Sequence, residues 1–355
     1  MLDHVAEFEW RGEGEEAEVA VFAPEEGMAR RGFERALPAA RLSGVESPVY
    51  AAAAPDGEGF VAASGSHAAP GLLSAPERGM LVSSGLPVAG LGVPPEEVPR
   101  LLARRLSEVR LPPLSAAGVL GVCERGAEAA AESGLIEEED LTLLAPEPGD
   151  PDALGRRAVE AGLREWGLTE RIGCFAVGAV HHGEGMEELG LQPGELVLAL
   201  RVTSGDLGRI SLSLHDERLR GLLSGEAEDG VAAAPLGSGE AADVEAASGA
   251  AANYACGLAA LALYALRRAL PEAGELSARA SWGIGGLTRQ DGRAVHRSGL
   301  SSRGEGEALL CGGDICRGKG RMHRSAPPFG APEVSGRLPW EEAGLVERLA
   351  GLDPL

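Results

Sequence analysis

Short apolar runs of the kind that buried β-strands show occur along much of the chain, and they limit the folds that it can adopt. The expected strands are 18–22, 48–54, 172–180 and 195–202. These runs alternate with segments of helical spacing, but not in the strict strand–helix–strand order of a parallel doubly wound fold. The expected class is therefore α/β in the broad, mixed sense (α+β), with mixed β-sheets packed against helices in a single large domain.

Several segments carry apolar residues at helical spacing. The expected helices are 94–110, 124–134, 150–167, a long apolar helix at 250–270 and a short closing helix at 344–352. Asp150 is a suitable N-cap for the third of them, because an aspartate side chain accepts hydrogen bonds from free backbone amides at a helix start. Aromatic residues make up only 4% of the chain, so its core must depend on Leu, Val and Ala.

Acidic stretches define the expected domain organisation. Residues 1–17 are acidic and are expected to form a flexible N-terminal segment, since chain ends are poorly ordered unless they are held by other elements. Residues 18–355 are expected to form the large domain. Within it, an acidic, glycine-rich connection is expected near 224–247.

The formal net charge of −22 restricts the partners of the chain. A strongly negative field repels nucleic acid, because neutralisation of phosphates by Lys and Arg dominates that affinity. No stretch approaches 18 uninterrupted apolar residues, so no membrane span is expected. The N-terminus lacks a basic region followed by an apolar run, and the five cysteines contain no CxxC pair. These features favour a reduced, cytoplasmic protein that does not bind RNA or a membrane.

Local motifs, taken alone, leave the chemistry open. The only lysine, Lys319, lies in the basic stretch CRGKGRMHRS (316–325), which could form a backbone nest for phosphate but lacks the GxxxxGK[ST] spacing. His181 and His182 are adjacent and would point to opposite faces of a strand, so a solvated turn is favoured over a metal site. TSGDLG (203–208) could bind an anion through its amides or could be an ordinary turn.

Several motifs match a known family in the order in which they occur. PVYAAAAPDGEG (48–59) is similar to PVVAMPDAHPGYG, RVTSGDLGR (201–209) to HTGSRGLGH, AAANYACGLA (250–259) to AAANYAWANR, and CRGKGRMHRS (316–325) to CHGAGRxMSR. From about Val19 to its end, the chain thus resembles the RtcB-type tRNA-splicing ligases. The resemblance implies their fold and their activity, which joins RNA ends carrying a 3′-phosphate and a 5′-hydroxyl with manganese and GTP.

The same resemblance implies that the residues of the family's site have been replaced. The positions that match its metal ligands, its guanylated histidine and the histidine of its VHRKGA motif are Leu81, Ser84, Cys174, Arg201, Gly285, His296 and Arg317. Leucine and glycine side chains offer no ligand atom, and an arginine places a positive charge where the cation would lie. A guanidinium stays protonated and cannot attack phosphorus as the family histidine does. Neither a catalytic residue nor a metal site is therefore expected, and manganese and GTP are not expected as cofactors.

Three functions follow from these observations. The favoured hypothesis is a catalytically inert binding or regulatory protein whose partner is an unknown protein or a small anion. The first alternative is an active RNA ligase with a rebuilt site, in which Lys319 accepts the guanylyl group. The second alternative is an anion or small-molecule binder in which guanidinium charge replaces metal charge. The residues available to the two alternatives are Cys174, Arg201, Arg209, His296, Arg317, Lys319 and Arg321.

Overall fold

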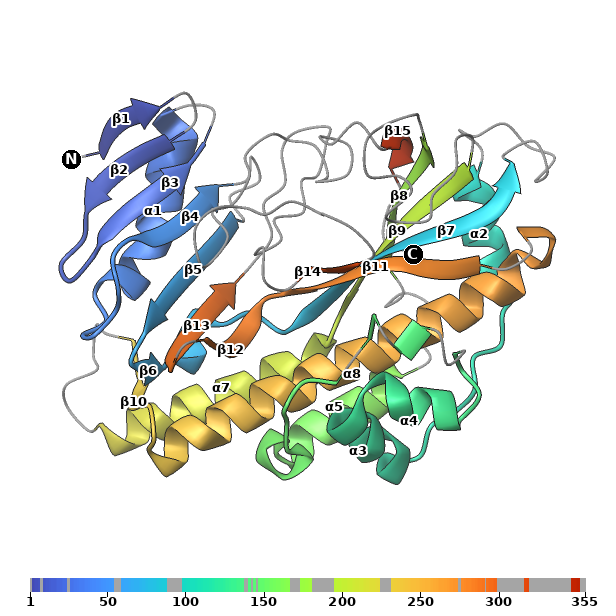
Figure 1. Ribbon diagram of the computed structural model, residues 1–355. Coiled ribbons are helices and arrows are strands. Elements are labelled where there is room, and N and C mark those ends of the chain that lie inside the picture. The colour runs from blue at the N-terminus through green and yellow to red at the C-terminus, as the bar shows by residue number, and fades with distance from the viewer. Residues whose placement is uncertain are drawn as a thin grey trace.

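The structure, a computed structural model, describes residues 2–6, 9–23, 26–53, 59–87, 98–136, 140–141, 143–144, 146–166, 173–180, 195–223, 231–273, 276–290, 292–298, 316–318 and 346–351. Two large β-sheets lie above a layer of helices, and the long helix α8 runs beneath both sheets (Figure 1). The expected mixed α/β class is confirmed.

The first sheet has seven strands in the order β1-β2-β3-β4-β5-β13-β12. All neighbouring strands are antiparallel except β3 and β4, which are parallel and are joined by helix α1. Antiparallel strands commonly pack one face on the core, so their side chains alternate between the core and the solvent. The bounds are β1 Leu2–Ala6, β2 Glu9–Glu13, β3 Glu18–Phe22, α1 Glu26–Ala40, β4 Val49–Ala53, β5 Gly59–Gly65, β12 Gly286–Gln290 and β13 Arg293–Ser298.

The second sheet has six strands in the order β14-β11-β7-β9-β8-β15 and is antiparallel throughout. Its bounds are β7 Glu77–Pro87, β8 Gly173–Val180, β9 Glu195–Thr203, β11 Leu276–Ile284, β14 Cys316–Gly318 and β15 Val346–Gly351. A two-stranded sheet pairs β6 (His67–Ala68) with β10 (Ala234–Pro235).

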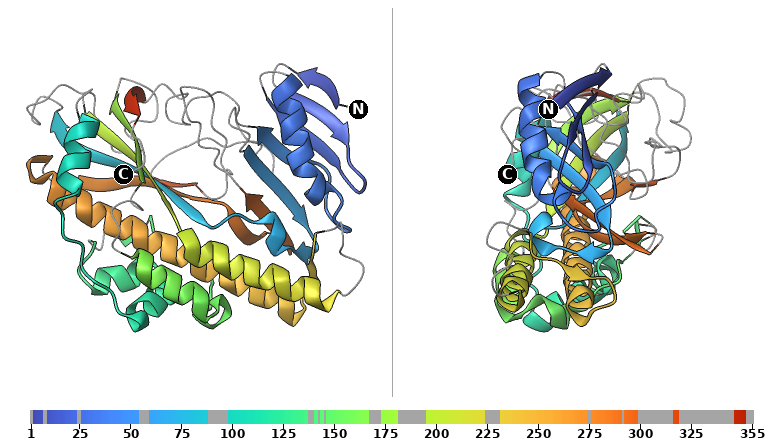
Figure 2. Two further views of the ribbon diagram at one scale, coloured as in Figure 1. Left: turned by 180° about the vertical axis from the view of Figure 1, so that it is seen from behind. Right: turned by 90° about the vertical axis from the view of Figure 1, so that its left-hand side faces the viewer.

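Helix α1 packs on β3, β4 and β5 of the first sheet. Helices α3, α4, α5, α7 and α8 form a layer on one side of the sheets, as both views in Figure 2 show, and α2 contacts α8. Their bounds are α2 Val98–Leu106, α3 Ala116–Arg125, α4 Ala127–Glu132, α5 Arg156–Glu165, α7 Gly205–Leu222 and α8 Gly239–Ala269, with 3-10 turns η1 Pro70–Leu72, η5 Pro151–Leu154 and η7 Pro271–Ala273. α8 contacts β7, β9, β11 and β12 as well as α2, α3, α4 and α7. It is therefore the element around which the rest of the fold packs.

The sequence of α8 explains its central place. Its apolar and small side chains cover the whole circumference in its C-terminal half, and a helix of that kind is buried. Ser238 caps its start, because its Oγ accepts a hydrogen bond from the backbone N–H of Ala241 at 3.1 Å. By length and composition α8 could cross a membrane, but 89% of its most apolar window is buried within the molecule. This burial is consistent with the core helix of a soluble protein.

The chain passes from one sheet to the other at a glycine pair. Gly285 and Gly286 connect β11 of the second sheet to β12 of the first, and both have positive φ angles, of 72° and 100°. Residues with a Cβ atom rarely adopt such angles, and glycine does so at little cost. The pair therefore lets adjacent strands belong to different sheets.

The N-terminal segment does not have the expected flexible form. Residues 2–6 and 9–13 form β1 and β2 at the edge of the first sheet. Leu2 and Trp10 pack against the apolar core beneath that sheet, and the Trp10 indole donates a hydrogen bond to the Ala23 carbonyl at 3.1 Å. These contacts outweigh the repulsion among the acidic side chains of the segment.

Two expected helices also differ. The long apolar helix begins at Gly239 rather than at residue 250, because Ser238 provides its cap well inside the expected connection at 224–247. The closing stretch forms strand β15, not a helix, because it pairs with the edge strand β8. Tertiary pairing of this kind overrides a local helical pattern. The strands expected at 18–22, 48–54, 172–180 and 195–202 are confirmed within a residue or two as β3, β4, β8 and β9.

Candidate functional site

Three of the positions that match family metal ligands lie together on the second sheet. β9 lies between β7 and β8, and Arg201 of β9 pairs with Gly79 of β7 and with Gly173 of β8. Cys174 is one residue pair away from this row, and Leu81 is two pairs away. We call Leu81, Cys174 and Arg201, which lie on three adjacent strands, the β7–β9–β8 patch. The register places positions 81 and 201 on the same face of the sheet, and position 174, which pairs with Leu200, on the opposite face. Leu81 and Arg201, which are 120 positions apart in the sequence, therefore lie on neighbouring strands.

The other two positions on this sheet lie outside the patch. Arg317 of β14 pairs with Ser281 of β11, and three inter-strand spacings, or about 14 Å, separate β14 from the strand that carries Arg201. Ser84 is farther along β7, three residues beyond Leu81. The sheet thus does not bring Arg201 and Arg317 together as the anion-binding alternative requires.

Gly285, a further matched position, lies in the wall of a cavity of about 300 Å³ at the junction of the two sheets. The start of β7, the residues around Glu147, helix α8 and the start of β12 form the other walls. A side chain at position 285 would meet Ser74 Oγ at 2.8 Å, closer than a Cβ atom can approach. Ser74 would have to move for any larger residue here, and the φ angle of 72° also favours glycine over histidine.

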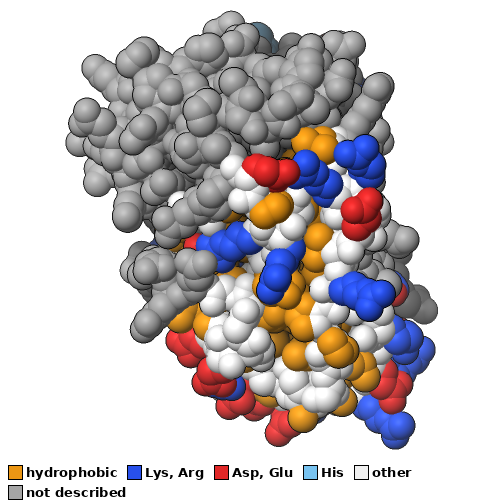
Figure 3. Space-filling model, turned by 90° about the vertical axis from the view of Figure 1, so that its right-hand side faces the viewer, with side chains coloured by type: hydrophobic (Ala, Val, Ile, Leu, Met, Phe, Trp, Pro, Cys, Tyr) orange, Lys and Arg blue, Asp and Glu red, His pale blue; other side chains and the backbone are white. Residues whose placement is uncertain are grey.

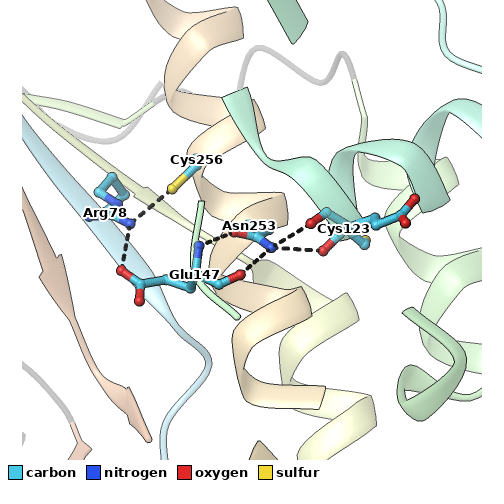
Figure 4. Close-up of polar contacts among 6 residues, drawn as sticks. Arg78, Cys123, Glu147, Asn253 and Cys256 are labelled. Carbon is cyan, nitrogen blue, oxygen red and sulfur yellow. Dashed lines mark hydrogen bonds and ion pairs between the residues drawn. The ribbon is translucent and has the colours of Figure 1, made fainter. Parts of the chain in front are cut away.

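The cavity borders a buried charged group that sequence reasoning did not identify. Arg78, on β7, is only 2% exposed. Its Nη2 donates a hydrogen bond to Cys256 Sγ at 2.9 Å and lies 3.6 Å from a carboxylate oxygen of Glu147 (Figure 4). Burial lowers the pKa of the guanidinium, but Cys256 and Glu147 outweigh this effect and hold the pKa above its ordinary value. Arg78 is thus a permanent buried cation compensated by two groups on other segments.

The motif AAANYACGLA is the structural centre of this region. Asn253 is fully buried, and its Nδ2 donates to the carbonyl oxygens of Cys123, Glu124 and Glu147 at 2.9 to 3.1 Å. Its Oδ1 accepts a hydrogen bond from the Glu147 backbone N–H at 2.7 Å. One side chain therefore holds the end of α3 and the Glu147 segment against α8 (Figure 4). This role accounts for the asparagine without any ligand.

The TSGDLG segment forms the start of α7, where a free helix N-terminus would favour an anion. A carboxylate of the protein already occupies that place. Glu165, which is largely buried, accepts a hydrogen bond from the Asp206 backbone N–H at 2.9 Å. Arg209 is held by Asp206 on the same helix, at 2.7 Å. Of the two alternatives for this segment, an external anion is thus not needed, because Glu165 serves the helix start, and Asp206 offsets the charge of Arg209.

His296 lies in the middle of β13. It is 2% exposed, and its Nε2 accepts a hydrogen bond from the Ala69 backbone N–H at 2.9 Å. Burial lowers the pKa of the imidazole to about 4. His296 is thus a neutral core histidine that joins β13 to the segment before η1, not a ligand-binding side chain.

Several sequence-derived candidates lie outside the described residues. They are His181, His182, Lys319 and Arg321. Within the described ranges, no three His, Cys, Asp or Glu side chains are grouped so that they could hold a metal ion.

Two features of the site escaped sequence reasoning, although a signal for each was present. Arg78 lies two residues before the apolar run MLV (80–82), and an arginine so close to a buried strand indicates a buried charge. Asn253, the only asparagine of the chain, was seen only as part of a packing motif. In neither case does the sequence reveal the partner, because Glu147 is over a hundred residues from Asn253.

The described geometry is suited to holding the fold and to exposing charged surfaces. A thiol-bearing residue, a leucine and an arginine make up the β7–β9–β8 patch, and the buried Arg78 is held by the Cys256 thiol and the Glu147 carboxylate. No protein-family model and no curated protein matches the sequence.

Proposed function

We propose that the chain is a catalytically inert, RtcB-like binding protein of the cytoplasm that has lost manganese-dependent guanylyl transfer. The resemblance to that family rests on the number and order of the sequence motifs. The observation that carries the proposal is the β7–β9–β8 patch, because positions 81, 174 and 201 would need to be close together in any member of the family. Positions 81 and 201 share one face of adjacent strands, which supports this part of the alignment, whereas position 174 belongs to the opposite face. The proposed loss of function is supported by the residue types at these positions.

The residue types in the patch are unsuited to a divalent cation. Manganese is bound by carboxylate, imidazole or thiolate groups, and of Leu81, Cys174 and Arg201 only the cysteine can supply one. The guanidinium of Arg201 would repel the ion. At the position of the family nucleophile, Arg317 stays protonated at every physiological pH. Suitable ligands for the cation and an acceptor for the guanylyl group are therefore both lacking at these matched positions.

A guanylylation assay tests the proposal directly. The purified chain is incubated with manganese and GTP labelled in its α-phosphate, and the covalent adduct is measured by radioactivity and by intact mass. We expect no adduct and less than stoichiometric manganese after dialysis. An RtcB-type ligase assayed in parallel shows that the conditions support the reaction.

A stoichiometric GMP adduct would overturn the proposal and favour the ligase with a rebuilt site. The Lys319→Ala variant would then show whether the lysine is the acceptor, since loss of the adduct assigns that role to it. The Arg317→His variant provides a second test. We expect it to remain inactive, because restoring the nucleophile does not restore the metal ligands at positions 81 and 201.

A further inference from the structure

A groove of about 560 Å³ lies where the C-terminal ends of α2 and α8 meet. Three arginines (Arg105, Arg110 and Arg268) and two glutamates (Glu108 and Glu272) line it, together with Val109 and Tyr264, so the charged side chains of the lining sum to +1. Figure 3 shows this side of the molecule, on which arginine and hydrophobic side chains lie side by side. A concentration of arginine is unusual in a chain whose net charge is −22.

Two of these arginines have no carboxylate partner within the described part of the chain. Most other described arginines form an ion pair, as Arg105 does with Glu272 at 2.7 Å. Arg110 and Arg268 are exposed and form none. Acidic residues outnumber basic ones by 54 to 32, so an arginine without a partner is not explained by a shortage of carboxylates. Their charge is available to an external anion.

Helix capping does not account for Arg268. Arginines near a helix C-terminus commonly offset the helix dipole or bind its last carbonyls. At the end of α8 the carbonyl of Ala269 already accepts a hydrogen bond from Arg105 at 3.1 Å. Arg267 instead binds Asp140 and the Leu276 carbonyl. The guanidinium carbon of Arg268 lies 5.3 Å from the centre of the Tyr264 ring, which orients it toward the groove.

Capping does not account for Arg110 either. The last carbonyls of α2 are satisfied by the turn that follows it: Arg104 O accepts from Ser107 Oγ, Arg105 O from the Glu108 N–H, and Leu106 O from the Val109 N–H. Arg110 lies beyond this turn and lines the groove from the side opposite α8. Neither arginine is thus required by the secondary structure.

We propose that this groove is a docking surface for an acidic segment of a partner protein, whose carboxylates bind Arg110 and Arg268 while a neighbouring apolar side chain packs on Val109 and Tyr264. Arginine suits this role because its planar guanidinium can bind a carboxylate through two parallel hydrogen bonds. A guanidinium already stacked on tyrosine loses little side-chain freedom on binding.

A protein segment fits the groove better than RNA does. A nucleic acid presents a phosphate at every nucleotide, and the charge of −22 on the rest of the chain repels such a ligand. A peptide with two or three carboxylates carries far less charge and also supplies apolar side chains. The inference is independent of the proposed loss of guanylyl transfer, because no residue of the β7–β9–β8 patch lines the groove.

The test uses the full chain and a fluorescein-labelled peptide that alternates pairs of acidic residues with leucine. Fluorescence anisotropy at low salt measures its affinity for the wild type, for Arg110→Ala/Arg268→Ala and for Arg31→Ala/Arg35→Ala. The last variant is a matched control, because it removes two exposed arginines from α1 and changes the net charge equally. We expect the groove variant to bind about tenfold more weakly or worse, a loss of about 1.4 kcal/mol, and the control to bind as the wild type does.

Further probes identify the ligand class. A peptide with amides in place of the acids should not bind, and a single-stranded RNA of similar length should bind more weakly than the acidic peptide. Equal affinity of the two double variants for the acidic peptide would overturn the proposal, as would no binding by the wild type. RNA binding that is tighter and depends on Arg110 and Arg268 would replace the protein segment with a nucleic acid. The altered side chains are exposed, and unchanged denaturation curves confirm that the variants fold.

Discussion

The side chain of Asn253 holds the backbone of Glu147 at both of its polar groups. Its Oδ1 accepts from the Glu147 N–H at 2.7 Å, and its Nδ2 donates to the Glu147 carbonyl at 2.9 Å. The same amide nitrogen also donates to two carbonyls at the end of α3. The segment that carries the Glu147 carboxylate is therefore fastened to α8, and the carboxylate in turn compensates the buried Arg78. Packing of the helical layer and burial of a charge depend on one amide.

Replacement of Asn253 by alanine should destabilise the protein strongly. The change leaves one N–H and three carbonyls of the backbone without their partner, and each unsatisfied buried group costs about 1–3 kcal/mol. Four groups at this cost predict a fall in the free energy of unfolding of about 4 kcal/mol or more, measured by urea denaturation. Ala252→Ser, one residue earlier on α8, is the comparison and should cost far less. A loss below about 1 kcal/mol for Asn253→Ala would contradict the role of this amide as a clasp.

Replacement of Arg78 by methionine tests the buried charge. The guanidinium is compensated by Cys256 and Glu147, and breaking a buried pair typically costs about 3–5 kcal/mol. Arg289→Met is the matched control at the same cavity, because Arg289 pairs with Glu245 but is half exposed, and such pairs contribute about 1 kcal/mol or less.

A double-mutant cycle separates the causes of the Arg78 effect. Glu147→Gln is combined with Arg78→Met, and the coupling free energy is read from denaturation of the four proteins. A clear coupling assigns the loss to the ion pair. If the Arg78→Met and Arg289→Met variants were equally stable, the buried arginine would have no special role.

The sequence predicted much of the fold because strand and helix periodicities are local properties. The runs at β3, β4, β8 and β9 and the helical spacing of α2 and α5 are each visible within about ten residues. The misassigned ends have a common physical cause. β1, β2 and β15 form because a neighbouring strand offers free hydrogen-bonding groups, and neither the acidic nor the helical pattern of these stretches reports that neighbour.

The candidate site was predictable only in part for the same reason. The resemblance to a family placed Leu81, Cys174 and Arg201 in one site. The sheet register brings positions 81 and 201 to one face of adjacent strands but puts position 174 on the opposite face. The isolated sequence could not show that Glu165 occupies the start of α7 or that His296 binds Ala69, because both contacts join segments remote in the chain. Each of these polar residues is engaged by the fold itself, which removes it from the set available to a ligand.

His296 should make stability depend on pH below neutrality. Burial lowers its pKa from 6.5 to about 4, so the unfolded chain binds a proton in this interval and the folded chain does not. Stability therefore falls as the pH decreases from 6.5 toward 4, and the contribution of this one group amounts to about 3 kcal/mol.

The measurement compares the wild type with His296→Gln by urea denaturation at several pH values from 7 to 4. Glutamine does not titrate, so we expect the variant to be less stable at pH 7 but to lose less stability on acidification. Identical pH slopes for the two proteins would show that His296 is not held neutral by burial. Other groups titrate equally in both proteins and cancel in the comparison.

Replacement of Gly205 by alanine should disturb the start of α7. Gly205 has a positive φ of 57°, which costs an alanine about 1–2 kcal/mol. Its new Cβ would also press against Glu165 Oε2, the atom that accepts the Asp206 N–H. Displacing this carboxylate exposes the free amides and removes a favourable charge from the helix start, so we expect a total loss of about 2–3 kcal/mol.

Gly221→Ala, near the other end of α7, is the matched control for Gly205→Ala. Nothing lies within 4 Å of a Cβ atom built there, and alanine restricts the unfolded chain more than glycine does. We expect this variant to be unchanged or more stable by up to about 1 kcal/mol. Opposite signs for the two substitutions in thermal denaturation would confirm that the Gly205 effect comes from its backbone angle and from Glu165, and not from adding a methyl group to α7. If both variants were equally stable, Glu165 would not be the anion that serves this helix start.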